Sequence, residues 1–133
     1  MRRIETVLAW ATIGVLAIYG PVETIYSRHE LWSPYYIIDV IAFGLLILGV
    51  VRSLRARPRS APALLTAGWA WAAANFWRAA FDRIGTLQRG GRLSLGSIEL
   101  QFVCTELVVA LLCLAVGILL VLRTAESTVV RSR

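Results

Sequence analysis

The chain has 133 residues, 58% of them hydrophobic, and a mean hydropathy of +0.69, which excludes an ordinary soluble domain. All 14 basic residues are arginine, and against 8 acids they give a net charge of +6. Such a charge can indicate nucleic-acid binding, but no basic cluster lies on a soluble segment that could follow a phosphate backbone. The composition therefore indicates a membrane protein that does not bind nucleic acid.

Four apolar stretches are long enough to cross a membrane, because a hydrocarbon core about 30 Å thick takes about 20 helical residues. They cover residues 4–22, 34–54, 63–84 and 98–122. The connections between them are short, so almost nothing remains for a soluble domain. We therefore expect residues 1–133 to form one all-α transmembrane domain with four spans.

The first span follows two arginines, as a secretory signal would, but its apolar run exceeds the usual length of about 7 to 15 residues. Tyr19 also stands where cleavage would require a small residue. We expect an uncleaved span, whereas cleavage would leave three spans. Pro21 should kink or end this helix, which would let Glu23 and Tyr26 fold back over the mouth of a bundle. An ordinary helix terminus with a solvated Glu23 is the alternative.

The second and third spans carry polar groups that are unusual in a membrane helix. Asp39 lies just over one turn from the start of the second span. In the third span Asn75, Arg78 and Asp82 are three and four residues apart, which places them on one helical face. Trp71 lies one turn before Asn75 and so deeper in the membrane, on the same face.

The fourth span contains Glu99 near its start and Glu106 seven residues later, again on one face. Its cysteines, Cys104 and Cys113, are nine residues apart and on opposite faces, so they cannot pair with each other. The sequence has no His/Cys cluster and no phosphate-binding loop of the P-loop type. We therefore expect neither a metal site nor a cofactor.

The sequence also indicates where the second span begins and how the third and fourth spans are connected. Pro34 opens the second span, where its missing backbone donor is tolerated. Residues 85–97 contain four glycines and alternate polar with apolar residues. This pattern predicts a mobile outer loop rather than another helix, with Gly90 and Gly91 at its turn.

The arginines flanking the spans are unevenly distributed between the two sides of the membrane. By the positive-inside rule, the side with more arginines is cytoplasmic, so both termini should be cytoplasmic, in a bacterial inner membrane. Small residues in all four spans let helix backbones approach closely, which favours an antiparallel four-helix transmembrane bundle. The side that we assign to the cytoplasm carries Arg2, Arg3, Arg52, Arg55, Arg57, Arg59, Arg123, Arg131 and Arg133, and the other side carries Arg28, Arg83, Arg89 and Arg92.

In this topology the intramembrane acids lie in the outer half of the bilayer. Glu106 would be about 12 Å deep at about 1.5 Å per residue, and an ionisable group at such depth should face the bundle interior and have a partner. We therefore expect Asp39, Arg78 and Glu106 to gather in one niche and to be the candidate catalytic residues. One arginine cannot neutralise every acid in this region, so at least one acid should be protonated or hydrated. The candidate ligand-binding residues around them are Glu23, Tyr26, Trp71, Asn75, Asp82 and Glu99.

Several functions fit this pattern. A pocket for a lipophilic small molecule is one, with proton-transfer chemistry of an isomerase or cyclase type at its carboxylates. A small oligomeric transporter or channel is the second, and a non-catalytic subunit of a larger membrane complex is the third. A purely structural account is also open, in which Arg78 and Asp82 form a surface pair and Glu106 is protonated and bonded to a backbone carbonyl.

Overall fold

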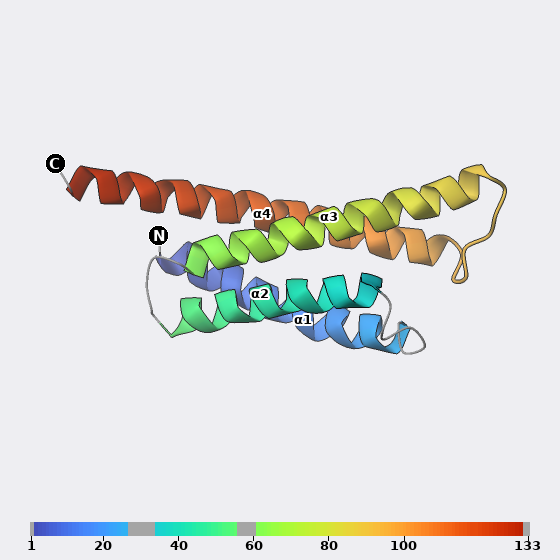
Figure 1. The fold of residues 1–133 in the computed structure, drawn as a ribbon, viewed down its shortest axis with the longest axis horizontal. Coiled ribbons are helices and arrows are strands. Elements are labelled where there is room, and N and C mark those ends of the chain that lie inside the picture. The colour runs from blue at the N-terminus through green and yellow to red at the C-terminus, as the bar shows by residue number, and fades with distance from the viewer. Residues whose placement is uncertain (1, 27–33, 56–60, 132–133) are drawn as a thin grey trace.

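The computed structural model describes residues 2–26, 34–55 and 61–131, and within these ranges every regular element is a helix (Figure 1). The helices are α1 (Arg2–Tyr26), α2 (Pro34–Leu54), α3 (Ala61–Gln88) and α4 (Ser97–Arg131). The predicted all-α class and the presence of four helices are confirmed. The side chains of residues 2, 23, 24, 26, 34–36 and 127–131 lie outside the described part of the chain.

The helix boundaries differ from expectation at two places. α1 does not end at Pro21 but continues to Tyr26, since proline is better tolerated in membrane-type helices than in soluble ones. α3 continues to Gln88, so the prediction of a loop is wrong for residues 85–88. α2 begins at Pro34, as predicted.

The turn after α3 is built as a glycine helix cap. Gly90 has a φ of 76°, in the left-handed region that favours glycine. The Gly91 amide donates to the Thr86 carbonyl and the Gly90 amide donates to the Leu87 carbonyl, each at 3.0 Å. This pair of bonds is the Schellman pattern, which satisfies carbonyls at the end of a helix. The predicted turn at Gly90 and Gly91 is confirmed.

Close contacts fix how the helices lie against one another. α3 packs against α2 and α4, and α1 also contacts both α2 and α4. In α3, Thr66 meets Gly117 of α4, whereas Arg83 meets Glu99, so residue numbers rise along one helix as they fall along the other. Figure 1 places the ends marked N and C on the same side of the molecule, which we call the terminal end. The opposite end, at the α3–α4 turn, is the turn end.

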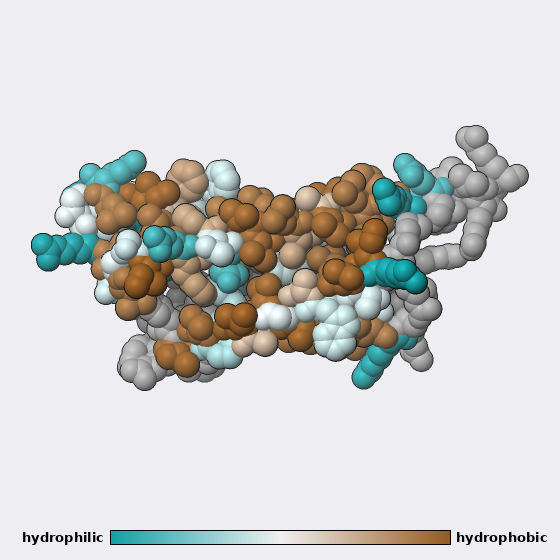
Figure 2. All heavy atoms as spheres, turned by 180° about the vertical axis from the view of Figure 1, so that it is seen from behind, coloured by the Kyte–Doolittle hydropathy of each residue, from teal (hydrophilic) through white to brown (hydrophobic). Residues whose placement is uncertain are grey.

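Three of the helices are long and apolar enough to cross a membrane: Arg3–Val22, Ile37–Leu54 and Ser97–Glu126. The fourth predicted span, in α3, has 28 residues and so enough length, at about 1.5 Å per residue. Its polar side chains separate it from the other three. Figure 2 shows one face of the molecule with hydrophobic groups around the middle and hydrophilic groups gathered toward both ends. The fold therefore supports a membrane protein.

The terminal half of the bundle is closed by tight packing. A Cβ added to Gly49 of α2 would lie 2.9 Å from Cγ of Leu65, and one added to Gly68 of α3 would lie 2.8 Å from Cγ of Leu46. Each leucine therefore occupies the space that a glycine of the facing helix leaves open. At the centre, buried Trp69 donates its indole N–H to Thr12 Oγ1 at 3.1 Å. This hydrogen bond ties α3 to α1.

Candidate functional site: a polar pocket at the turn end

The turn half of the bundle encloses a pocket of about 340 Å³. Its volume falls in the range of small-molecule sites, about 300 to 1,000 Å³, and its walls combine apolar side chains with a few polar groups, as such sites usually do. All four helices and the α3–α4 connection contribute to it. The lining residues are Tyr19 and Val22 of α1, Asp39 of α2, Asn75, Phe76, Arg78, Ala79 and Arg83 of α3, Leu95 of the connection, and Ile98, Glu99, Phe102 and Val103 of α4.

Tyr19 organises the aromatic part of the wall. Its ring meets Phe76 edge to face at a centroid distance of 4.9 Å and meets Phe43 in the same manner at 5.9 Å. It stacks on Phe102 at 6.3 Å. Such pairs fix the orientation of rings beyond what apolar contact alone would do. The pocket thus has an apolar wall of ordered rings drawn from α1, α3 and α4.

Asp39 and Asn75 bring polar groups from two helices together. Asn75 donates its side-chain N–H to Asp39 Oδ1 at 3.3 Å, in a partly buried setting. Behind them lies a small cavity of about 20 Å³, which shares Tyr19, Asp39, Asn75 and Phe76 with the larger pocket. A cavity of this size holds about one water molecule. Asp39 therefore lines both the pocket and a smaller space that can hold water.

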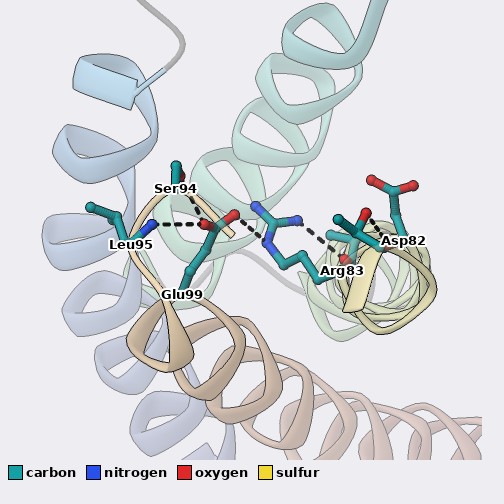
Figure 3. A network of polar contacts seen from close by, with 7 residues as sticks. Asp82, Arg83, Ser94, Leu95 and Glu99 are labelled. Atoms are coloured by element: carbon teal, nitrogen blue, oxygen red, sulfur yellow. Dashed lines mark hydrogen bonds and ion pairs between the residues drawn. The ribbon is translucent and has the colours of Figure 1, made fainter. Parts of the chain in front are cut away.

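Arg83 and Glu99 form an ion pair on the other polar side of the pocket (Figure 3). Arg83 Nε donates to Glu99 Oε1 at 2.8 Å, and Arg83 Nη1 donates to the Ala79 carbonyl at 3.1 Å. The side chains are only 23% and 13% exposed, respectively. The pair is therefore more shielded from water than an ordinary surface salt bridge, which contributes little.

The second oxygen of Glu99 organises the start of α4. Glu99 Oε2 accepts hydrogen bonds from Ser94 Oγ at 2.9 Å and from the Leu95 amide at 3.3 Å. A carboxylate in the first turn of a helix is favourable because of the unpaired amides and the helix dipole there. Both carboxylate oxygens of Glu99 thus have donors, and they hold Leu95 at the rim of the pocket and Arg83 in its wall.

The structure brings four of the predicted site residues together. Asp39, Asn75, Arg78 and Glu99 all line the pocket, so the expected convergence of polar groups from α2, α3 and α4 is present. This includes Asp39 and Arg78, two of the three residues expected to form the niche.

Other predicted site residues lie elsewhere. Trp71 and Asp82 are exposed and are not part of the lining, and the Asp82 carboxylate points away from the Arg83–Glu99 pair in Figure 3. The predicted stripe therefore splits, because Asn75 and Arg78 line the pocket and Asp82 does not. The side chains of Glu23 and Tyr26 lie outside the described residues.

Glu106 does not join Asp39 and Arg78 in the pocket. Its side chain is half-buried, and its Oε2 atom is buried without a hydrogen-bond partner among the described residues. It lies between the buried positions Val103 and Ala110 on the face of α4 that packs inward. The shared face of Glu99 and Glu106 is thus a correct expectation, but only Glu99 reaches the site.

Sequence reasoning missed Arg83, Tyr19 and Phe102 as site residues. The topology prediction counts Arg83 only among the arginines of the outer side, because it lies next to the end of the predicted span 63–84. A signal was present, since Asn75, Ala79 and Arg83 are spaced by four residues and so form one stripe on a helix. The aromatic residues gave no comparable signal because their partners come from other helices.

The assembled site combines two guanidinium groups, two carboxylates, an amide and a wall of aromatic rings. In the described part of the chain, no three His, Cys, Asp or Glu side chains are close enough to hold a metal ion. No family model, curated protein or solved structure matches this chain. The pocket geometry is therefore the basis on which a function is proposed.

Proposed function

We propose that this chain is a polytopic protein of a bacterial inner membrane, an antiparallel four-helix transmembrane bundle with both termini cytoplasmic. The uneven distribution of arginines supports this topology, as do the opposite directions of the paired contacts along α3 and α4. α3 would cross the bilayer as the fourth span. Its polar side chains Asn75 and Arg83 lie in the pocket wall rather than toward lipid, which reduces the cost of placing them in the membrane.

We further propose that the pocket binds a lipophilic small molecule in the outer half of the bilayer. The observation that carries this proposal is the pocket of about 340 Å³, whose polar groups from three helices face an ordered aromatic wall. A filled interior with the same charges paired to one another would have left no space for a ligand. An apolar body against Tyr19 and Phe102 and a polar end near Arg83 and Asp39 would match the two sides of the pocket.

Proton-transfer chemistry of an isomerase or cyclase type remains part of the proposal, with Asp39 as the donor or acceptor. In such a step an alkene takes a proton from the acid, and loss of a proton from a neighbouring carbon to the carboxylate returns an isomer. Asp39 lies in the pocket and is held by Asn75, whereas Glu106 lies outside the lining. Arg78 also lines the pocket and would contribute a positive charge to it.

The test is saturable binding of N-phenyl-1-naphthylamine, a neutral lipophilic fluorophore, to the protein in lipid nanodiscs. Ala79→Trp places a large ring inside the pocket, because Ala79 is one of its half-buried lining residues. Ala74→Trp is the matched control, since Ala74 lies on an exposed face of the same helix. We expect binding by the native protein and the control, and an affinity at least about tenfold weaker in Ala79→Trp, a loss of about 1.4 kcal/mol.

Equal binding by a correctly folded Ala79→Trp protein would overturn the pocket proposal, as would the absence of saturable binding by the native chain. Proton or ion flux through reconstituted vesicles without probe binding would favour the small oligomeric transporter or channel. If neither probe binding nor flux is found, and the chain forms a stoichiometric complex with a larger membrane protein, the non-catalytic subunit would be favoured.

A further inference from the structure

We infer that the pocket ligand is an amphiphile with an anionic, acceptor-rich head, a carboxylate or a phosphate monoester, whose head contacts Arg83 and Arg78. This inference rests on the proposed function and adds the chemical class of the ligand. It is carried by the hydrogen-bonding capacity that the pocket presents to a ligand.

Arg83 has more hydrogen-bond donors than the described residues use. A guanidinium has five N–H donors and no acceptor. In Arg83, Nε donates to Glu99 and one Nη1 hydrogen donates to the Ala79 carbonyl. The other three N–H groups, including both on Nη2, make no hydrogen bond within residues 2–26, 34–55 and 61–131. Since Arg83 lines the pocket, a ligand there could accept hydrogen bonds from these groups.

Glu99 does not use up this capacity. Its Oε1 accepts from Arg83, and its Oε2 accepts from Ser94 and from the Leu95 amide. Three donors therefore already offset the carboxylate charge, which weakens its repulsion of an incoming anion. The same contacts hold the guanidinium in place before a ligand arrives, so binding would require little further ordering of the Arg83 side chain.

Arg78 adds a second guanidinium to the same pocket, and guanidinium groups suit planar carboxylates and phosphates because they can donate two parallel N–H bonds. Asn75 already donates to Asp39. The acceptor Asp39 is on the α2 side of the pocket, and the two guanidinium donors are on the α3 side. The pocket as a whole holds two arginines and the carboxylates of Asp39 and Glu99, but on the α3 side a cationic head would meet the two arginines. An anionic head on the α3 side is the arrangement with complementary charge.

The rest of the ligand follows from the apolar lining. Phe102, Val103 and Ile98 of α4 face the pocket together with Tyr19 and Val22 of α1. A free inorganic anion would leave this surface without a partner. A hydrocarbon chain attached to the head would cover it. The ligand class that matches both sides is thus a single-chain amphiphile rather than a free ion.

The experiment compares binding of oleate and of oleyl alcohol, which have the same chain and differ in the charge of the head, to the protein in nanodiscs. Arg83→Gln combined with Glu99→Gln removes the guanidinium without leaving its carboxylate partner buried and alone. Arg78→Gln removes the second guanidinium and leaves the Arg83–Glu99 pair intact. Arg89→Gln is the matched control, because Arg89 is exposed in the turn after α3 and does not line the pocket.

We expect oleate to bind the native protein and Arg89→Gln equally, and to bind both pocket variants about tenfold more weakly, as for loss of a charge-assisted hydrogen bond of about 1.4 kcal/mol or more. Oleyl alcohol binding should change by less than about twofold, because its head lacks the charge that the arginines recognise. Equal affinity of the native protein for the two probes, or unchanged oleate binding in the pocket variants, would overturn the inference.

Two further results separate this inference from the proposed function. Saturable N-phenyl-1-naphthylamine binding that Ala79→Trp abolishes, together with oleate binding that ignores the arginines, would leave the pocket proposal in place and reject the anionic head. Displacement of oleate by millimolar inorganic phosphate alone, to the same extent as by excess oleate, would reject the amphiphile and identify a free anion as the occupant.

Discussion

Replacement of Gly49 by alanine tests the tight packing that closes the terminal half of the bundle and so confines the pocket to the turn half. The new Cβ would lie 2.9 Å from both Cγ and Cδ2 of Leu65 and 3.0 Å from its backbone nitrogen. A rotamer change of Leu65 cannot relieve the backbone contact, so α2 and α3 would have to separate slightly. Overpacking of this kind typically costs about 1–3 kcal/mol.

Gly44→Ala is the matched control because Gly44 lies in the same helix and its added Cβ would meet no atom within 4 Å. Both variants gain the helix propensity of alanine over glycine, about 1 kcal/mol, and this gain cancels when the two are compared. We therefore expect Gly49→Ala to be about 1–3 kcal/mol less stable than Gly44→Ala. Reversible unfolding by sodium dodecyl sulfate, followed by tryptophan fluorescence, measures the difference. Equal stability of the two variants would refute the proposed close approach of α2 and α3.

Three other predictions concern the centre of the bundle, the buried acid of α4 and the topology. Thr12→Val should lower the free energy of unfolding by about 1 kcal/mol, because Trp69 loses its buried acceptor, whereas Thr12→Ser keeps the hydroxyl and should change stability much less in the same assay. Glu106→Gln should be neutral or stabilising, because Glu106 has a buried oxygen without a hydrogen-bond partner among the described residues. It should leave oleate binding unchanged, because Glu106 does not line the pocket. A tenfold loss of oleate affinity would show that Glu106 belongs to the site. The topology can be tested in a background with both native cysteines replaced by serine. A membrane-impermeant maleimide should label Ser94→Cys in intact cells, and it should label Glu126→Cys only after permeabilisation. The reverse pattern would contradict cytoplasmic termini.

The fold was largely predictable because it depends on signals that act locally. Three such signals are the runs of apolar residues about 20 long, the proline at the start of α2 and the glycine pair after α3. Each of them predicts one local structure. The end of α3 was harder to predict. Residues 85–88 include Gly85 and lack an apolar period, whereas the structure continues the helix through them to the glycine cap.

The candidate site was only partly predictable because its geometry depends on contacts between helices. The sequence indicates that Asp39, Asn75 and Glu99 belong in the outer half of the membrane, and they line one pocket. It does not indicate how each helix is rotated about its axis. That rotation turns Arg83 into the pocket and leaves Asp82 outside it, although the two residues are adjacent in the sequence.

The same limit applies to Glu106. Its depth correctly indicated that it would be at least partly buried, and its face is the one that packs inward. Depth and face do not determine whether a residue reaches a cavity or packs beside a neighbouring helix. Only the relative positions of α3 and α4 decide this, and they place Glu99, not Glu106, at the pocket.

The occupant of the pocket at the turn end is the property to measure. A crystal structure of the native protein grown in a lipidic mesophase with oleate would test it in one measurement. We predict an elongated density along Tyr19 and Phe102 whose head lies within hydrogen-bonding distance of Arg83 or Arg78. A pocket filled by the protein's own side chains, or oleate bound only on the outer surface of the helices, would contradict the account.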